Sequence, residues 1–286
     1  MISSRELENK GKSYKTILGV VKAMKALSAA NVRKGGTVLE HTRRYRNFIE
    51  KAASIVCSLP GVSILPTGEK KLIVAFGSQY GLCGALNERV LKTVAESIRE
   101  FEHMAGIIYV GSRISDRAPA LAIPVESIEA PGSVEGLDDT ISELLIMIYS
   151  KYKDKTFDEM FFVYPSFVSE TLSVIRYHVL PPPFMPEKEP AEPPILYITS
   201  SEAMEGLLEE YIYVQLYATA LETVIAENES RMRSMDYASK NIRKKIDETA
   251  SSYNYALQEE VTGEIIEIIG GYEALRKGRR KTGETI

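Results

Sequence analysis

The residues whose types and spacing could support chemistry lie in one glycine-rich turn, residues 77–87. The turn stands between a run typical of a buried strand and a run typical of a helix, and it reads Gly77-Ser78-Gln79-Tyr80-Gly81-Leu82-Cys83-Gly84-Ala85-Leu86-Asn87. Glycines at such a junction let backbone N–H groups surround an anion such as a phosphate. The turn has neither GxGxxG nor GxxxxGKS/T, no lysine follows it, and no acidic residue is placed for a ribose. Nucleotide binding is therefore the weaker interpretation of these glycines.

Cys83 is the candidate nucleophile of the same turn. A catalytic thiol needs a nearby base, and no histidine stands out near it, so we expect a packed turn residue. The chain has two cysteines, Cys57 and Cys83, and three histidines that are far apart, His41, His103 and His178. None of them has CxxC or HxxxH spacing, which argues against a structural zinc or a disulfide framework. We expect no catalytic residue, no metal and no cofactor.

The turn belongs to a stretch in which strands and helices alternate. Strand-like runs cover residues 71–77, 106–111, 124–128, 160–164 and 172–180, and helix-like runs cover 86–104, 113–121 and 137–152. This alternation predicts a mostly parallel, Rossmann-like sheet covered by helices on both faces. A proline-rich, acidic connection follows at 181–194 and predicts a semi-rigid link. Residues 195–199 are expected to form one last strand.

The C-terminal third predicts one very long helix. From Ser201 to about Leu275 there is no proline, and no glycine occurs between Gly206 and Gly263. Apolar residues recur there on a 4-3 spacing: Leu207, Tyr211, Val214, Leu221, Ile225, Met232, Met235, Ile242, Ile246 and Tyr253. A seam of this length is typical of a coiled coil. At 1.5 Å per residue the helix would be roughly 110 Å long, which suits a strut or a shaft.

Residues 1–59 predict a second long helix with a seam of the same kind. The expected seam residues are Ile17, Val20, Met24, Leu27, Val38, Tyr45, Phe48, Ala52, Ile55 and Leu59. Gly19 and the pair Gly35-Gly36 weaken a helix by about 1 kcal/mol each relative to alanine, so either tertiary packing overrides them or the helix bends near Gly35. The expected fold class is α/β, with a long antiparallel coiled coil of the N- and C-terminal helices and an inserted Rossmann-like domain. The expected limits are 1–59, 70–198 and 200–286.

Composition and charge narrow the class of protein. The chain has 286 residues, 44 % of them hydrophobic, and a formal net charge of −4. No apolar run reaches the ~18 residues of a membrane span, and a soluble protein in a reducing compartment is expected. Residues 1–60 hold twelve Lys and Arg against four Asp and Glu. Because aromatic residues are sparse there and the whole chain is acidic, a nucleic-acid partner is not expected.

Four blocks of the sequence resemble, in order, the gamma subunit of rotary F-type ATP synthases. Residues 22–34 (KAMKALSAANVRK) resemble the family's KAMKMVAAAKLRKA, and the turn resembles SDRGLCGGFN with Gln79-Tyr80 in place of Asp-Arg. Residues 211–217 (YIYVQLY) resemble its YIEVQLYRALLES run. Residues 229–241 (ESRMRSMDYASKN) and 253–271 resemble its C-terminal signature. The resemblance covers nearly the whole chain.

The resemblance implies a central rotor shaft that does no chemistry itself. It implies one copy per complex, in contact with the alpha and beta subunits of the catalytic hexamer, an epsilon-type subunit and the membrane c-ring. The location implied is the cytoplasmic face of a prokaryotic plasma membrane, where the complex couples ATP synthesis to ion transport. The residues carried over are Arg231, Gln258, Thr262 and Glu264 for contacts with the catalytic subunits; Met24, Ala26, Met232 and Met235 for shaft packing; and Arg33, Lys34, Gly81, Cys83 and Tyr197 for basic, foot and ring contacts.

The chain departs from the family pattern at residues 253–262, where YNYALQEEVT stands for YNRARQAxIT. Two arginines are lost, two glutamates appear, and five basic residues follow at 276–281. These departures are the basis for expecting a divergent branch, such as the alternate or N-type enzymes. Three alternatives stay open: a non-rotary coiled-coil scaffold that forms homodimers, an α/β enzyme that uses the glycine-rich turn, and the central stalk of a V- or A-type ATPase. The stalk would lack the inserted sheet.

Overall fold

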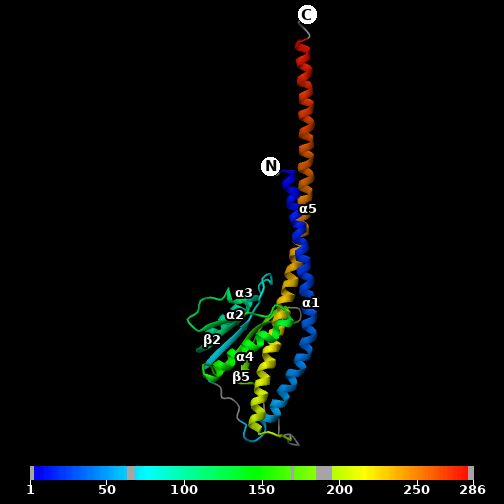
Figure 1. Ribbon diagram of the computed structural model, residues 1–286. Helices are drawn as coiled ribbons and strands as arrows, with labels where there is room; N and C mark the ends of the chain where they lie inside the picture. Colours follow the sequence, from blue (N-terminus) through cyan, green and yellow to red (C-terminus); the bar gives the residue numbers. More distant parts are fainter. Residues whose placement is uncertain (1–2, 63–67, 169–170, 185–194, 283–286) are drawn as a thin grey trace. The chain divides into compact units, whose positions relative to one another are not determined.

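The structure is a computed structural model that describes residues 3–62, 68–168, 171–184 and 195–282 (Figure 1). Its elements are α1 Ser4–Cys57, β1 Lys70–Phe76, α2 Leu86–Glu100, β2 His103–Val110, α3 Ser112–Ser115, β3 Val125–Ile128, η1 Val134–Gly136, α4 Leu137–Lys153, β4 Glu159–Val168, β5 Thr171–Leu180 and α5 Ser200–Thr282. Internal contacts divide the chain into two units, Lys25–Ser234 and the combination of Met1–Met24 with Met235–Ile286. The limits 1–59, 70–198 and 200–286 stay a prediction.

The larger unit contains a five-stranded sheet in the order β3-β2-β1-β4-β5. Strands β1 to β4 are parallel, and β5 is antiparallel to β4. The α/β fold class is confirmed, and each expected strand between 70 and 180 is present. The strand expected at residues 195–199 is wrong, because Ile195 is 84 % and Tyr197 97 % exposed and neither residue pairs with the described strands.

Both faces of the sheet are covered, and the two faces meet different partners. Alternate side chains of a strand point to opposite faces. Ile73 and Ala75 of β1 pack with Val90 and Val94 of α2. Residues of the other face join the main core with α4, α1 and α5, among them Leu72, Val74, Phe76, Leu144, Ile49, Leu216 and Leu221. The inserted domain is therefore built directly onto the paired helices.

Helices α1 and α5 lie side by side and antiparallel within the larger unit (Figure 1). Asn31 contacts Asn228 and Arg43 contacts Glu222, so the partner number falls as the α1 number rises. On α5, the expected seam residues Tyr211, Val214, Ala218, Leu221 and Asn228 are buried, but so are most of their neighbours, because this part of α5 also packs on the sheet core. Burial therefore does not single out the 4-3 seam, which stays a prediction.

The seam expected on α1 is wrong at several positions. Ile17, Val20, Leu27, Tyr45 and Phe48 are 45 to 65 % exposed. Most buried positions lie at multiples of seven residues instead, namely Leu7, Val21, Ser28, Gly35, Thr42, Ile49 and Val56, and Ala53 is buried as well. Small and polar residues occupy the centre of this seam, which lets the two helix backbones approach closely.

Gly35 shows how close this approach is. A Cβ atom added there would lie 2.6 Å from Cγ1 of Ile225 on α5, whereas one added at Gly36 would meet nothing within 4 Å. Packing against α5 thus overrides the helix-weakening effect of Gly35, and α1 continues through the glycine pair.

The smaller unit repeats the antiparallel pairing. The Ser4 hydroxyl donates a hydrogen bond to Oε2 of Glu260 at 2.7 Å, and an added Cβ at Gly11 would lie 3.9 Å from Thr249. Thr249 is buried, with an exposed fraction of 8 %. Residues after Glu260 lie past the first residue of α1, and 261–273 are exposed.

Gly35→Val should lower the free energy of unfolding by about 1–3 kcal/mol, because the new side chain overlaps Ile225. The matched change Gly36→Ala should raise it by about 0.5–1 kcal/mol through helix propensity alone. Urea unfolding followed by circular dichroism measures both values. Equal responses of the two variants would contradict the close approach at Gly35.

Candidate functional site

The glycine-rich turn lies where β1 ends and α2 begins. Its own residues tie it together: the Ser78 backbone N–H donates to Oδ1 of Asn87 at 2.9 Å, and Nδ2 of Asn87 donates to the Ser78 hydroxyl at 2.8 Å. The Cys83 thiol donates to the same hydroxyl, with Sγ and Oγ 3.3 Å apart. Cys83 is buried, and these contacts make it a packed turn residue.

A carboxylate of the same chain occupies the position where a phosphate-binding turn would hold its anion. Oε2 and Oε1 of Glu227 on α5 accept hydrogen bonds from the backbone N–H groups of Gln79, at 3.1 Å, and Tyr80, at 3.2 Å. Only 3 % of Glu227 is exposed. The turn therefore does bind an anion, and that anion is the side-chain carboxylate of Glu227 on α5. This argues against the nucleotide interpretation, because two amides of the turn already bind Glu227.

Arg231 completes this arrangement one helical turn further along α5. Its guanidinium forms an ion pair with Glu227, and its Nε donates to the Gly81 carbonyl oxygen at 3.2 Å. Its Nη2 also donates to the carbonyl oxygen of Tyr80 at 3.4 Å. Arg231 is 7 % exposed. A buried ion pair needs such additional hydrogen bonds to offset the loss of solvation, and the turn supplies them.

Asn228 extends the network to α1. Its Oδ1 accepts from Nη1 of Arg231 at 3.4 Å and from Nδ2 of Asn31 at 3.2 Å, while its own Nδ2 donates to the carbonyl of Val224. We call Glu227, Asn228 and Arg231, with Asn31 and the backbone of residues 79–83, the clamp. It joins α1, α5 and the sheet domain at one point.

Two further contacts hold the turn in the clamp. Oε1 of Gln79 accepts from the backbone N–H groups of Ser112, at 3.1 Å, and Ala130, at 2.9 Å. The Ser230 hydroxyl of α5 donates to the Cys83 carbonyl oxygen at 2.6 Å. Gln79, one of the departures from the family pattern, thus connects the ends of three neighbouring strands.

The backbone within the clamp is strained. Leu82 has a φ of 66°, and the left-handed conformation costs a residue with a side chain about 1–2 kcal/mol. Its side chain is nevertheless 61 % exposed and makes little packing contact. Strain at such a position persists only where the surroundings fix it, and here the clamp fixes the residues on both sides of Leu82.

The other residues singled out from the sequence are spread over the chain. Gln258, Thr262, Glu264, Ala26, Arg33 and Tyr197 are exposed, Met24 and Met232 are half-buried, and Met235 is 4 % exposed. Lys34 forms an ion pair with Glu135 of η1. Of the thirteen, Arg231, Gly81 and Cys83 meet at the glycine-rich turn. Sequence reasoning missed Glu227, Asn228, Asn31 and Gln79, although the Glu227–Arg231 spacing of four residues was an available signal.

Two further features were sought in the described part of the chain, a metal-binding cluster and a membrane-spanning helix, and neither is found there. No group of three or more His, Cys, Asp or Glu residues there could hold a metal ion. None of the helices described has a stretch that is both long and apolar enough to cross a bilayer.

Comparison with known proteins shows which family the chain belongs to. A family model described as ATP synthase matches residues 3–275. Two ATP synthase gamma chains, from Pelotomaculum thermopropionicum and Desulforamulus reducens, are each 30 % identical to it, over 283 and 289 aligned residues. Each alignment covers 96 % of this chain and 100 % of the relative. The chain belongs to the ATP synthase gamma-chain family.

Solved structures share the gamma-chain fold. A chain of the Euglena gracilis mitochondrial ATP synthase, in an OSCP/F1/c-ring assembly, matches with a TM-score of 0.66 and 18 % identity, covering 96 % of this chain and 95 % of that chain. A chain from the central stalk and c-ring of the Tetrahymena thermophila enzyme matches with a TM-score of 0.56 and 19 % identity, covering 77 % and 99 %. In this member of the family, the clamp is the point at which the inserted domain is fixed to the paired helices.

Glu227→Ala should lower the free energy of unfolding by about 3–5 kcal/mol, because it leaves the Arg231 charge buried and unpaired. The Gln79 and Tyr80 amides should also lose protection in hydrogen exchange. The double variant Glu227→Ala/Arg231→Met should recover part of this loss, since no unpaired charge remains.

Glu40→Ala is the matched control. Glu40 forms an exposed ion pair with Arg44 on α1, and its loss should change stability by less than about 0.5 kcal/mol. If Glu227→Ala costs no more than Glu40→Ala, the clamp does not hold the turn.

Proposed function

We propose that this chain is the central rotor shaft of an F-type ATP synthase, which couples ion flow through a membrane ring to conformational change in a catalytic hexamer. Family membership supports this, together with two long helices paired around an inserted α/β domain. The chain itself is non-catalytic in this proposal. Its faces differ around the shaft, so each rotation angle favours different states of the surrounding sites.

The observation that carries the proposal is the end of α5 that extends past α1. This end exposes an apolar stripe that includes Val261, Ile265, Ile266, Ile268, Ile269 and Tyr272, each 48 to 72 % exposed. Among the described residues no second helix covers this stripe. Exposed apolar surface of this kind marks a protein interface, and a single helix suits insertion into the centre of a ring of subunits.

We propose Gln258, Thr262 and Glu264 as contacts with the alpha and beta subunits of the hexamer. All three side chains are exposed on this part of α5, and the Thr262 hydroxyl donates to the Gln258 carbonyl oxygen at 2.7 Å. Arg231 stays a predicted contact as well, but its guanidinium is used inside the clamp, so we expect it to act mainly by positioning the turn.

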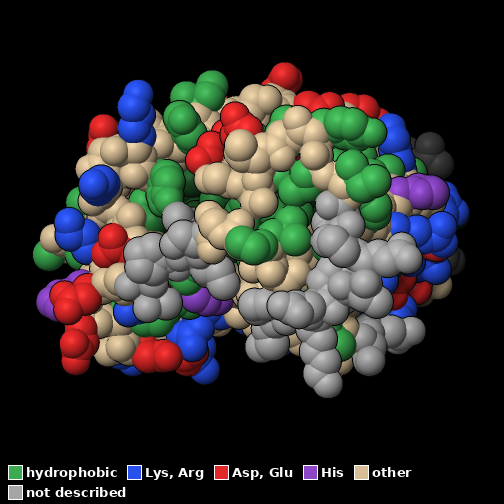
Figure 2. Space-filling view, turned by 90° about the horizontal axis from the view of Figure 1, so that it is seen from below, with side chains coloured by type: hydrophobic (Ala, Val, Ile, Leu, Met, Phe, Trp, Pro, Cys, Tyr) green, Lys and Arg blue, Asp and Glu red, His purple; other side chains and the backbone are tan. Residues whose placement is uncertain are grey.

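One end of the larger unit offers a surface for the ring and an epsilon-type subunit. Figure 2 looks onto the end where α1 finishes and α5 starts, and hydrophobic side chains gather in the middle of that face while charged ones lie toward its sides. Ile195, Tyr197 and Ile198 are 56 to 97 % exposed. We propose Tyr197 for the ring contact and the cytoplasmic face of a prokaryotic plasma membrane as the location. The departures at residues 253–262 favour a divergent branch of the family.

Native mass spectrometry of the chain co-expressed with its own alpha and beta subunits should give one copy per hexamer, because a shaft pairs its own two helices. A non-rotary scaffold would instead form a homodimer through the seam and fail to join the hexamer. Either of those results would overturn the rotor proposal.

Gln258→Ala/Thr262→Ala should lower the ATPase activity of the assembled complex by about five- to thirtyfold, the loss expected for one or two hydrogen bonds of about 1 kcal/mol each. Stability of the isolated chain should not change, because both side chains are exposed. Glu96→Ala on the exposed face of α2 is the control and should leave activity unaltered. Equal activity of all three proteins would remove these residues from the hexamer contact.

A further inference from the structure

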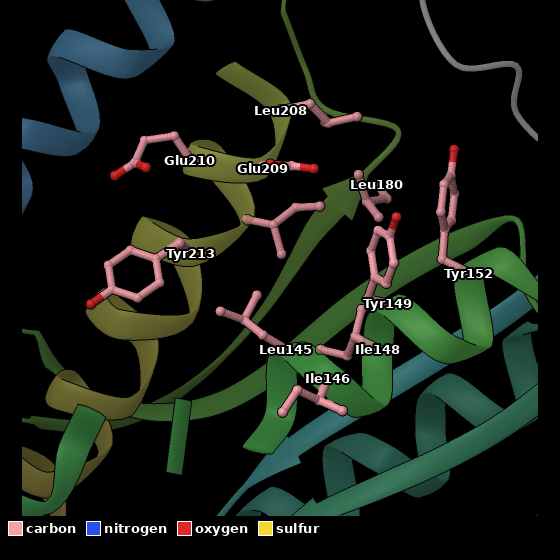
Figure 3. A pocket seen from close by; sticks show the side chains of 11 residues that line it. Leu145, Ile146, Ile148, Tyr149, Tyr152, Leu180, Leu208, Glu209, Glu210 and Tyr213 are labelled. Carbon is pink, nitrogen blue, oxygen red and sulfur yellow. The ribbon is translucent and has the colours of Figure 1, made fainter. Parts of the chain in front are cut away.

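An open apolar groove lies between α4 and α5 of the larger unit (Figure 3). Its volume is about 430 Å³, and α4 contributes Leu145, Ile146, Ile148, Tyr149 and Tyr152, α5 contributes Leu208, Glu209, Glu210, Ile212 and Tyr213, and β5 contributes Leu180. Tyr149 and Leu180 point toward one another across the groove in Figure 3. The groove shares no residue with the clamp.

The apolar surface continues beyond the groove. Ile146 is 73 % and Tyr149 62 % exposed, and Ile146 also borders a second hollow on the other side of α4 with Met147 and Ser150. A site for a small molecule buries about 70–90 % of its ligand. This surface is too open for that, and it suits the apolar face of a helix laid along a groove.

The charged residues that line the groove are Glu209 and Glu210. Residues 200–213 of α5 contain four acidic and no basic residues, whereas α4 carries Asp138, Asp139 and Glu143 and, in its last turn, Lys151 and Lys153. Lys151 forms an ion pair with Glu126. Glu210 accepts a hydrogen bond from the Tyr45 hydroxyl at 2.6 Å. Glu205 and Glu209 lie one turn apart on α5, and no cation of the described chain pairs with either of them. Like charges at this spacing are unfavourable, and a basic partner would relieve them.

We propose that this groove binds an amphipathic basic helix of a partner protein. Its apolar side chains would fill the space between Leu145, Leu208 and Leu180, and a Lys or Arg on its flank would pair with Glu209. Figure 3 shows the Glu209 carboxylate on the side of the groove that faces Leu180, while Glu210 points toward α1. The proposal is independent of the rotor function, because the isolated full-length chain can test it.

The test uses two synthetic helices of about five turns, identical in their leucine face and carrying either Lys or Glu on both flanks. A scrambled peptide with the composition of the Lys helix is the third probe. Fluorescence anisotropy should give a dissociation constant for the Lys helix at least about tenfold lower than for the other two. Binding should weaken as salt is added.

Ile146→Ser and Glu209→Lys should each weaken binding of the Lys helix at least about tenfold. Neither change should unfold the chain, since both side chains are exposed. Val168→Ser, which is 54 % exposed on β4, and Glu96→Lys on α2 are the matched controls and should leave the affinity unchanged.

Four results would overturn the proposal. The Lys helix binds no tighter than its scrambled form, or the groove variants behave like their controls. Alternatively, dodecylammonium binds with the same sensitivity to Ile146→Ser while the peptides do not, which would make the groove a small-molecule site. Sedimentation showing a dimer that Ile146→Ser dissociates would assign the groove to a second copy of this chain.

Discussion

The buried charge of Glu227 is the constraint on which much of the larger unit depends. A carboxylate that is 3 % exposed must recover in hydrogen bonds what it loses in solvation, and it does so from the Arg231 guanidinium and two backbone amides of the turn. The same turn contains Leu82 with its positive φ. The position of α5 and the shape of the turn therefore determine each other.

A second constraint is the close approach of the two long helices. Ser28, Gly35 and Thr42 follow one another at seven-residue intervals on the buried side of α1, and at Gly35 there is no room even for a methyl group beside Ile225. Residues 211–228 of α5 are buried on nearly every side, against α1 on one and the sheet core on the other. Dense packing of this kind transmits strain with little compression, which suits a part that must turn as one body.

Much of the fold could be predicted because large apolar residues recur at regular spacing in the strands between 70 and 180 and along the long helix α5. The α1 seam could not be found by the same rule, since its buried positions are small or polar while Leu27 and Phe48 face outward. Residues 195–199 look like a strand but have no neighbour among the described strands. The clamp was hidden for another reason: Glu227 and Gln79 are 148 residues apart, and only the folded chain shows that the anion of the turn is a side chain.

The clamp and the core contribute in different ways to holding the inserted domain on the shaft. Apolar burial has no direction, so a helix that slips against the core loses little until the contact area itself falls. Hydrogen bonds fail below about 120°, and a slip of α5 relative to the turn would leave Arg231 or Glu227 buried without its partner. Even a small slip would therefore raise the free energy of the folded chain, by about 3–5 kcal/mol once the buried ion pair is broken. Resistance to twisting between the inserted domain and the paired helices thus comes from a few directional contacts around Arg231, and Asn31 connects α1 to the same contacts. A torque applied to the inserted domain would reach α1 and α5 together. Asn228 of α5 contacts both Asn31 of α1 and Arg231, and Arg231 binds the turn of the inserted domain.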